Sequence, residues 1–190
     1  MLRFCNILKG HFTNYYAIQV RTKSEQKFIR LFESLYPNGD VRLYFPKRVL
    51  PVRRKGTIVQ TTAAVFPGYL FIGSDGTDIA EHFNLFRYLN HTYRFLKTTQ
   101  KVAPLAGRDL EIALHFIEKI GPLAGLSKVY YNDESRIVVL SGPLAGLEGN
   151  IVKVDRRKKR AKVKLDVYED SFLIDLGFEV IEMANKQKAS

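Results

Sequence analysis

A cluster of lysines and arginines in the C-terminal third is the part of this sequence best suited to binding chemistry. Residues 141–165, SGPLAGLEGNIVKVDRRKKRAKVKL, join a glycine-rich turn to two runs of alternating side chains. The basic side chains here are Lys153, Arg156, Arg157, Lys158, Lys159, Arg160, Lys162 and Lys164. Between Lys153 and Lys164, Asp155 is the only acid. This charge run predicts binding to the phosphates of a polyanion, and the alternative is a solvated hairpin tip.

The elements that would hold these cations are two strands. Residues 150–154 and 162–167 alternate in side-chain type, which predicts a β-hairpin with the cations at its tip. Gly142 begins a Gly-Pro turn, and Gly146 and Gly149 can adopt a positive φ. We expect a cationic face with Lys153, Lys162 and Lys164, and an apolar face formed by Val152, Val154, Val163, Leu165 and Val167.

A second basic run lies in the first half of the chain. It contains Lys47, Arg48, Arg53, Arg54 and Lys55 without an intervening acid. The flanking residues 41–52 and 59–72 look extended, with a turn at 53–56. We expect a hairpin that follows phosphates, and the alternative is an edge strand guarded by cations.

The remaining elements alternate between strands and helices. Residues 15–21 predict a strand with Tyr16, Ile18 and Val20 on one face. The Thr-Lys-Ser-Glu pattern at 22–25 predicts a capping box, followed by a helix that ends before Pro37. Further helices are expected at 78–89 and 108–120, with a short strand at 93–96 between them. The apolar stripe of the last helix is Leu110, Leu114 and Ile117, and Gly121 ends it.

The change from mixed to all-β patterns predicts two domains. We place an N-terminal domain at residues 13–120, a linker at 121–134, a β-domain at 135–184 and a fraying tail at 185–190. We expect the N-terminal lead to be loosely attached.

Composition restricts the class of protein. The 190 residues are 46% hydrophobic, and the net charge is +11 with a pI near 9.7, which indicates a folded protein with anionic partners. A single cysteine, Cys5, fits a reducing compartment. No apolar run reaches the roughly 20 residues of a membrane span. We expect a cytoplasmic monomer with no membrane partner.

Catalysis is not expected. The histidines His11, His82, His91 and His115 are scattered, and no Cys/His pair has the spacing of a metal site. Residues 121–128 lack the Gly-Lys-Ser/Thr ending of a phosphate loop. We therefore expect no enzyme activity, no metal and no cofactor.

The residues described so far resemble a known family. GPLAGLEGNIVKVD is similar to the KOW motif, YYAIQVRTKSEQKF to the first strand and helix of the NusG N-terminal domain, and VFPGYLFI to its FPGY strand. The resemblance covers nearly all of residues 13–184. It implies an α+β protein in which a NusG-like α/β sandwich with an antiparallel sheet precedes a small SH3-like KOW β-barrel.

The resemblance also implies partners. NusG-like proteins bind bacterial RNA polymerase through the clamp helices, which makes Tyr16, Phe66, Pro67 and Tyr69 candidate contacts. Because aromatic residues in strands are often buried, the alternative for Phe66 and Tyr69 is a place in the hydrophobic core. The basic hairpin with Lys47, Arg48, Arg53, Arg54 and Lys55 would lie near upstream or non-template DNA.

Within the family, LEGNIVKVDRRKKRAKVKLDV and LIDLGFEVIE look closer to the specialised LoaP type. This implies processive antitermination at selected operons, guided by a hairpin in a structured leader RNA. Leu144 stands where other KOW domains usually have Phe, and residues 167–170 replace a Phe-Gly-Arg turn. The alternative is a general adaptor that couples polymerase to the ribosome or to a termination factor through protein contacts.

Overall fold

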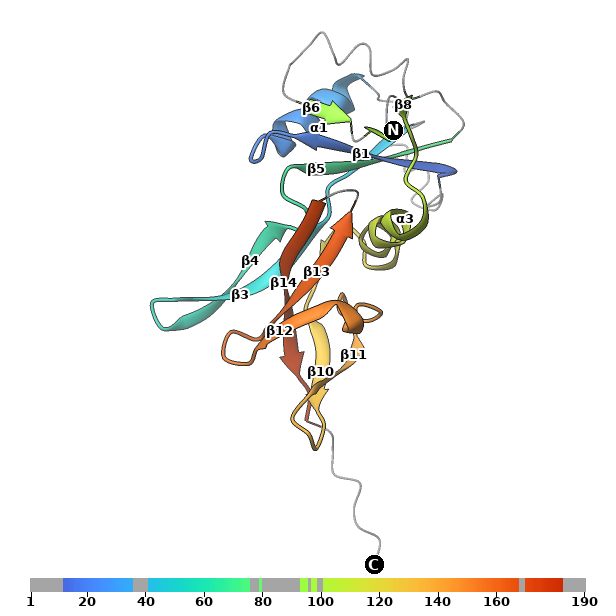
Figure 1. Cartoon of the computed structure of the whole chain (residues 1–190). Helices are drawn as coiled ribbons and strands as arrows, with labels where there is room; N and C mark the ends of the chain where they lie inside the picture. Colours follow the sequence, from blue (N-terminus) through green and yellow to red (C-terminus); the bar gives the residue numbers. More distant parts are fainter. Residues whose placement is uncertain are drawn as a thin grey trace, which may run out of the picture. The chain divides into compact units, whose positions relative to one another are not determined.

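The computed structural model describes residues 12–35, 41–75, 79, 93–95, 97–98, 101–167 and 170–182. The chain divides into two compact units. Unit 1 contains Met1–Pro46 and Phe66–Lys119, and unit 2 contains Lys47–Val65 and Ile120–Ser190. The hairpin of the second basic run therefore belongs to the same unit as the C-terminal strands (Figure 1).

An antiparallel sheet forms the centre of unit 1. Its strand order is β2-β5-β1-β6. The bounds are Asn14–Val20 for β1, Val41–Tyr44 for β2, Tyr69–Ser74 for β5 and Tyr93–Phe95 for β6. A separate pair joins β7 (Lys97–Thr98) to β8 (Lys101–Val102). The strands expected at 15–21 and 93–96 are confirmed, apart from Leu96, which lies outside the described residues.

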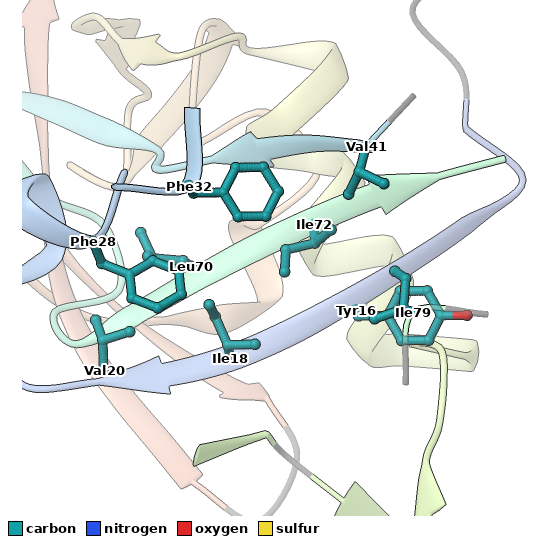
Figure 2. Packing of buried hydrophobic residues seen from close by; sticks show 9 residues of the cluster. All are labelled: Tyr16, Ile18, Val20, Phe28, Phe32, Val41, Leu70, Ile72 and Ile79. Atoms are coloured by element: carbon teal, nitrogen blue, oxygen red, sulfur yellow. The ribbon is translucent and has the colours of Figure 1, made fainter. Parts of the chain in front are cut away.

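Helix α1 (Glu25–Leu35) packs an apolar face against this sheet. Phe28 and Phe32 lie over Leu70 and Ile72 of β5, next to Ile18 of β1 (Figure 2). Each of these side chains is at most 8% exposed, and burying one stabilises the fold by about 1.5–3 kcal/mol. The helix expected from apolar spacing is therefore confirmed.

The start of α1 differs from the expected capping box. The helix begins at Glu25, and the Phe28 amide donates to the Ser24 carbonyl, so Ser24 and not Thr22 stands at the N-cap position. The buried Glu25 carboxylate accepts the Gly68 amide at 2.9 Å. The predicted box is wrong because the glutamate holds the turn before β5 and does not reach back along its own helix.

The last helix of unit 1 joins α3 (Gly107–Leu114) to a π-helical turn, η1 (His115–Lys119). Of the predicted stripe, Ile117 is buried, and Leu110 and Leu114 are half-buried. The buried face also includes Ile112, Ala113 and Phe116, which the prediction did not name. Gly121 follows the helix with a φ of 85°, as expected for a C-terminal stop.

Several expectations fall outside the described residues. They concern the lead up to residue 11, the tail from residue 183 and the helix at 78–89, of which only the helical, buried Ile79 is described.

Unit 2 contains a five-stranded sheet in the order β11-β10-β14-β13-β12 (Figure 1). The bounds are Ser127–Tyr131 for β10, Ile137–Ser141 for β11, Ile151–Asp155 for β12, Arg160–Val167 for β13 and Asp170–Val180 for β14. A 3-10 turn, η2 (Glu148–Asn150), precedes β12. β10 runs parallel to β14, and the other pairs are antiparallel. Fully buried side chains include Val129, Leu144, Val163, Leu165 and Phe178.

The expected linker at 121–134 is wrong, because it contains two strands. β9 (Leu123–Ala124) pairs with β3 (Lys47–Arg54), and β10 lies between β11 and β14 in the main sheet. Turn residues surround β10 in the sequence, and one of its two pairing partners, β14, is distant along the chain.

The hairpin of β3 and β4 (Thr57–Ala64) packs on the same sheet. Gly177 of β14 makes room for it, because a Cβ there would stand 3.0 Å from Pro51 Cδ and 3.1 Å from the Val49 carbonyl oxygen. The missing side chain therefore allows the backbone of β3 to approach β14.

Candidate nucleic-acid interface

The hairpin of β12 and β13 supplies the cluster of cations found in the sequence. Val163, Leu165 and Val167 are at most 1% exposed, as expected for its apolar face. Val152 departs from the expectation with 56% exposure. The register shifts between Ile151 and Lys153, and this bulge turns Val152 outward.

The turn between these strands is fixed by its own side chains. The Asp155 carboxylate accepts the Lys158 amide at 2.8 Å, and this hydrogen bond holds the pKa of Asp155 below its ordinary value. Lys159 takes the left-handed conformation with a φ of 51°. Its carbonyl oxygen accepts the Phe178 amide at 3.0 Å, which ties the turn to β14.

Acids from neighbouring positions pair with several of the cations. Asp175 lies opposite Lys162 in the register of β13 and β14, and its carboxylate is 3.1 Å from Lys162 Nζ and 3.8 Å from Arg160 Nη1. Lys164 pairs with Asp166 at 3.6 Å, and Lys158 with Asp155 at 3.8 Å. The expectation of a single nearby acid is therefore wrong, because Asp166 lies two residues after Lys164 and strand pairing brings Asp175 to the cations from a distance in sequence.

Two arginines of the cluster are bound to the protein itself. The Arg156 guanidinium lies 4.3 Å from the centre of the Tyr131 ring and donates to the Ser135 carbonyl. Arg160 Nε donates to the Pro51 carbonyl of β3 at 3.2 Å. These contacts give both side chains a part in holding unit 2 together.

The remaining cations of the cluster are Lys153, Arg157 and Lys159. All three are exposed. Within the part of the chain that the structure describes, none of them forms a salt bridge. They are therefore the members of the cluster best placed to meet an external anion.

The second basic run also contains both residues that are bonded within the protein and side chains that are exposed. Arg48 donates to the carbonyls of Ala64 and Val65, and its burial lowers the pKa of the guanidinium. The backbone of Lys47, and not its ammonium group, donates to the Pro122 carbonyl at 3.0 Å. The exposed members are Arg53, Arg54 and Lys55, at and beside the tip of the β3–β4 hairpin.

An open hollow of about 420 Å³ lies between the two basic hairpins of unit 2. Its lining comes from both and consists of Pro51, Val52, Arg53, Ile58, Arg157, Lys158, Lys159 and Arg160. The structure thus brings together two cation runs that sequence reasoning had kept apart and assigned to different partners.

Sequence reasoning missed two residues of this surface. Ile58 lines the hollow and is 56% exposed, but the sequence pattern predicts that an isoleucine in an alternating strand is a buried core residue. Asp175 neutralises cations of β13, but its position opposite Lys162 depends on a register that spacing along the sequence does not define.

The FPGY segment forms a turn in unit 1. The Tyr69 amide donates to the Phe66 carbonyl at 3.1 Å, and Gly68 has a φ of 80°, which suits the third residue of a type II turn after Pro67. The Phe66 ring packs against Phe71 and Phe116 and is 1% exposed.

The aromatic residues among the candidate polymerase contacts are buried. Tyr16 and Tyr69 are 9% and 4% exposed, and the Tyr69 hydroxyl is 3.1 Å from Gln19 Nε2. Of the four candidate polymerase contacts, only Pro67 has an exposed side chain. The aromatic residues are core in this structure, because β1 and β5 turn Tyr16 and Tyr69 into packed faces of the sheet and the Phe66 ring packs between Phe71 and Phe116.

Two family models match this chain. The model described as "Transcription termination factor nusG" matches residues 13–114, more than half of the chain, and the KOW motif model matches residues 135–166. This chain belongs to the NusG family. The expected α+β fold, with a NusG N-terminal domain followed by a barrel-like KOW region, is confirmed.

NusG proteins align with most of the chain. "Transcription termination/antitermination protein NusG" of Helicobacter pylori (strain J99) is 23% identical over 176 residues, covering 89% of this chain and 97% of the relative. The protein of the same name from Synechocystis sp. is 24% identical over 194 residues, with 93% and 91% covered. A solved structure described as "Domain interaction in Thermotoga maritima NusG" shares 16% identity and a TM-score of 0.44, with 86% of this chain and 93% of that chain covered.

Two observations bear on other kinds of site. Within the described ranges, His, Cys, Asp and Glu nowhere gather in groups of three or more that could hold a metal ion. No helix in the described part of this NusG-family chain is long and apolar enough to cross a membrane.

Proposed function

We propose that this NusG-family chain is a specialised transcription elongation factor of the LoaP type. It binds RNA polymerase through its N-terminal domain and structured nascent RNA through unit 2, and it promotes processive antitermination at selected operons. Its family membership supports a role in transcription, and the names of its relatives include both termination and antitermination.

The observation that carries RNA binding is the set of exposed cations around one hollow. Arg53, Arg157 and Lys159 line it and form no salt bridge among the described residues. Each phosphate that such cations neutralise releases counterions, which favours binding. Folded RNA is recognised through its shape, its backbone and its unpaired bases, and a fixed cationic surface suits these contacts.

Polymerase binding follows from the family resemblance, and the exposed Pro67 of the FPGY turn is the contact we propose. The Glu25 carboxylate holds this turn by accepting a hydrogen bond from the Gly68 amide, and the Phe66 ring holds it by packing in the core. The aromatic residues Phe66 and Tyr69 then act by supporting the turn, and Tyr16 acts by packing in the core of the sheet. We propose that Arg54 and Lys55 remain available to DNA.

A general adaptor that works by protein contacts is the second candidate. Exposed apolar side chains on the barrel favour it, since Leu140, Val152 and Leu173 are 49%, 56% and 60% exposed. Such side chains suit a protein partner better than an RNA backbone.

A mobility-shift assay with the full chain distinguishes the two candidates. The double charge reversal of Arg157→Glu and Lys159→Glu should weaken binding to a structured leader RNA. It should also reduce the slope of log K against log salt by about 1.4–1.8, which corresponds to two phosphate contacts. The matched control reverses the exposed Lys27 and Arg30 of α1 and should leave the affinity for RNA nearly unchanged.

The same assay can contradict the proposal. Failure of the unmodified chain to bind structured RNA, together with retention of a ribosomal protein, would favour the adaptor. Equal losses in the test and control variants would show only a general effect of net charge.

A further inference from the structure

We propose that the hollow between the two basic hairpins binds one unpaired RNA nucleotide together with its flanking phosphates. This inference rests on the proposed RNA binding and names the part of the RNA that unit 2 recognises. It also assigns the β3–β4 hairpin, through Arg53 and Ile58, to the same RNA as the β12–β13 turn.

The lining of the hollow has the composition that a nucleotide requires. Pro51, Val52 and Ile58 give it an apolar side, and Ile58 remains 56% exposed. The cations of both hairpins form the rest of the lining. A nucleotide combines the apolar face of a base with a charged backbone, so the apolar side fits the base while the cations face the phosphates.

The size of the hollow agrees with this ligand. Its volume of about 420 Å³ lies within the range of roughly 300–1,000 Å³ typical of small-ligand pockets. In a paired stem, the base faces are stacked inside the helix and cannot reach an apolar wall. Ile58 would therefore gain a contact only from a nucleotide in a loop or bulge.

In the turn that borders the hollow, a lysine has a backbone conformation that glycine adopts more easily. Lys159 lines the hollow with a φ of 51°, and the left-handed conformation costs a residue other than glycine roughly 1–2 kcal/mol. Lys55, at the tip of the other hairpin, has a φ of 47°. Backbone strain of this kind is often retained at functional sites, and here it places a cation beside the hollow.

The two sides of the hollow are fixed to each other. The Arg160 guanidinium bonds to the Pro51 carbonyl, and Gly177 allows β3 to approach β14. β3 also pairs with β9 within unit 2. A site that exists before binding loses less conformational entropy when the ligand enters.

The test measures binding of the full chain to three fluorescent probes. The first is an RNA hairpin with one unpaired bulge nucleotide, the second is the same stem fully paired, and the third is the bulged hairpin made of DNA. The unmodified chain should bind the bulged RNA at least 5-fold more tightly than either other probe.

Ile58→Ser isolates the apolar side, because it leaves every cation in place. It should weaken binding to the bulged RNA about 5-fold and change binding to the paired stem less than 2-fold. Leu140→Ser is the matched control, since Leu140 is a similarly exposed apolar residue on β11, and it should leave both affinities unchanged.

Arg53→Ala tests whether the β3–β4 hairpin shares the ligand, and it should weaken binding to the bulged RNA at least 3-fold. Circular dichroism melting curves should show that all variants remain folded. RNA binding that is unaffected by both Ile58→Ser and Arg53→Ala would overturn this inference while leaving the proposed function standing. Equal binding of the paired stem or the DNA hairpin would also overturn it, and absence of all RNA binding would overturn both proposals.

Discussion

At the scale of single residues, the structure divides the basic side chains into two groups. Arg48, Arg156 and Arg160 donate hydrogen bonds to backbone carbonyls. Arg157 and Lys159 are exposed and form no salt bridge among the described residues. Charge counting predicted where the cations gather, but it could not separate these groups, because that depends on contacts between distant segments.

Lys159→Gly should separate stability from binding. Glycine relieves the left-handed backbone but adds freedom to the unfolded chain, so the free energy of unfolding should stay equal or rise by up to about 1 kcal/mol. The affinity for structured RNA should fall, because a cation beside the hollow is lost. Urea denaturation and fluorescence anisotropy measure the two effects.

Ser135→Gly is the matched control for this substitution. Ser135 has a φ of 62° in the turn before β11, so glycine should relieve its backbone equally without affecting RNA affinity. An unchanged affinity in Lys159→Gly would remove Lys159 from the binding surface.

Tyr15 should make stability depend on alkaline pH. Burial raises the pKa of the Tyr15 hydroxyl, and its hydrogen bond to the Glu118 carboxylate adds to this shift. Above pH 10, the unfolded chain releases this proton while the folded chain keeps it, so stability should fall as pH rises further. Urea titrations between pH 9 and about 11 should show a shallower decline for Tyr15→Phe, and an identical decline would contradict this assignment.

At the scale of elements, strand pairing decides what sequence patterns cannot. Alternation of side-chain types predicted the β12–β13 hairpin. The same alternation continues through the bulge that exposes Val152, so the bulge could not be predicted from the sequence. Strand β10 was missed because its partners are β11 and the distant β14. The burial of Phe66 likewise depends on Phe116, 50 positions later in the chain.

Gly177→Ala should disturb the docking of β3 on β14 without removing a cation. The new Cβ would lie 2.5 Å from Leu126 Cδ2 and 3.0 Å from Pro51 Cδ, so we expect a destabilisation of about 1–3 kcal/mol. RNA affinity should fall as well, because the two sides of the hollow separate. Thermal melting measures the loss of stability, and anisotropy at a temperature below the melting transition measures the change in RNA affinity.

Gly149→Ala serves as the control, because nothing lies within 4 Å of a Cβ at Gly149. It should leave both stability and RNA affinity close to those of the unmodified chain. A Gly177→Ala variant that is destabilised but binds RNA normally would mean that binding does not need the docked β3–β4 hairpin.

At the scale of the whole molecule, the two-part plan could be predicted from the sequence because local motifs carry it. The FPGY segment and the KOW-like segment both resemble their family patterns, and the family models match the same regions. The boundary between compact units could not be predicted, because residues 47–65 join the C-terminal strands in space. The shared hollow was missed for the same reason.

The central claim is that exposed cations of unit 2 guide antitermination through RNA. Transcription in vitro with purified RNA polymerase tests it, on templates with and without a structured leader upstream of a terminator. The unmodified chain should raise terminator readthrough only on the leader template, and the variant with Arg157→Glu and Lys159→Glu should lose that effect while still binding polymerase. Readthrough that does not depend on the leader, or that survives the double charge reversal, would contradict the account.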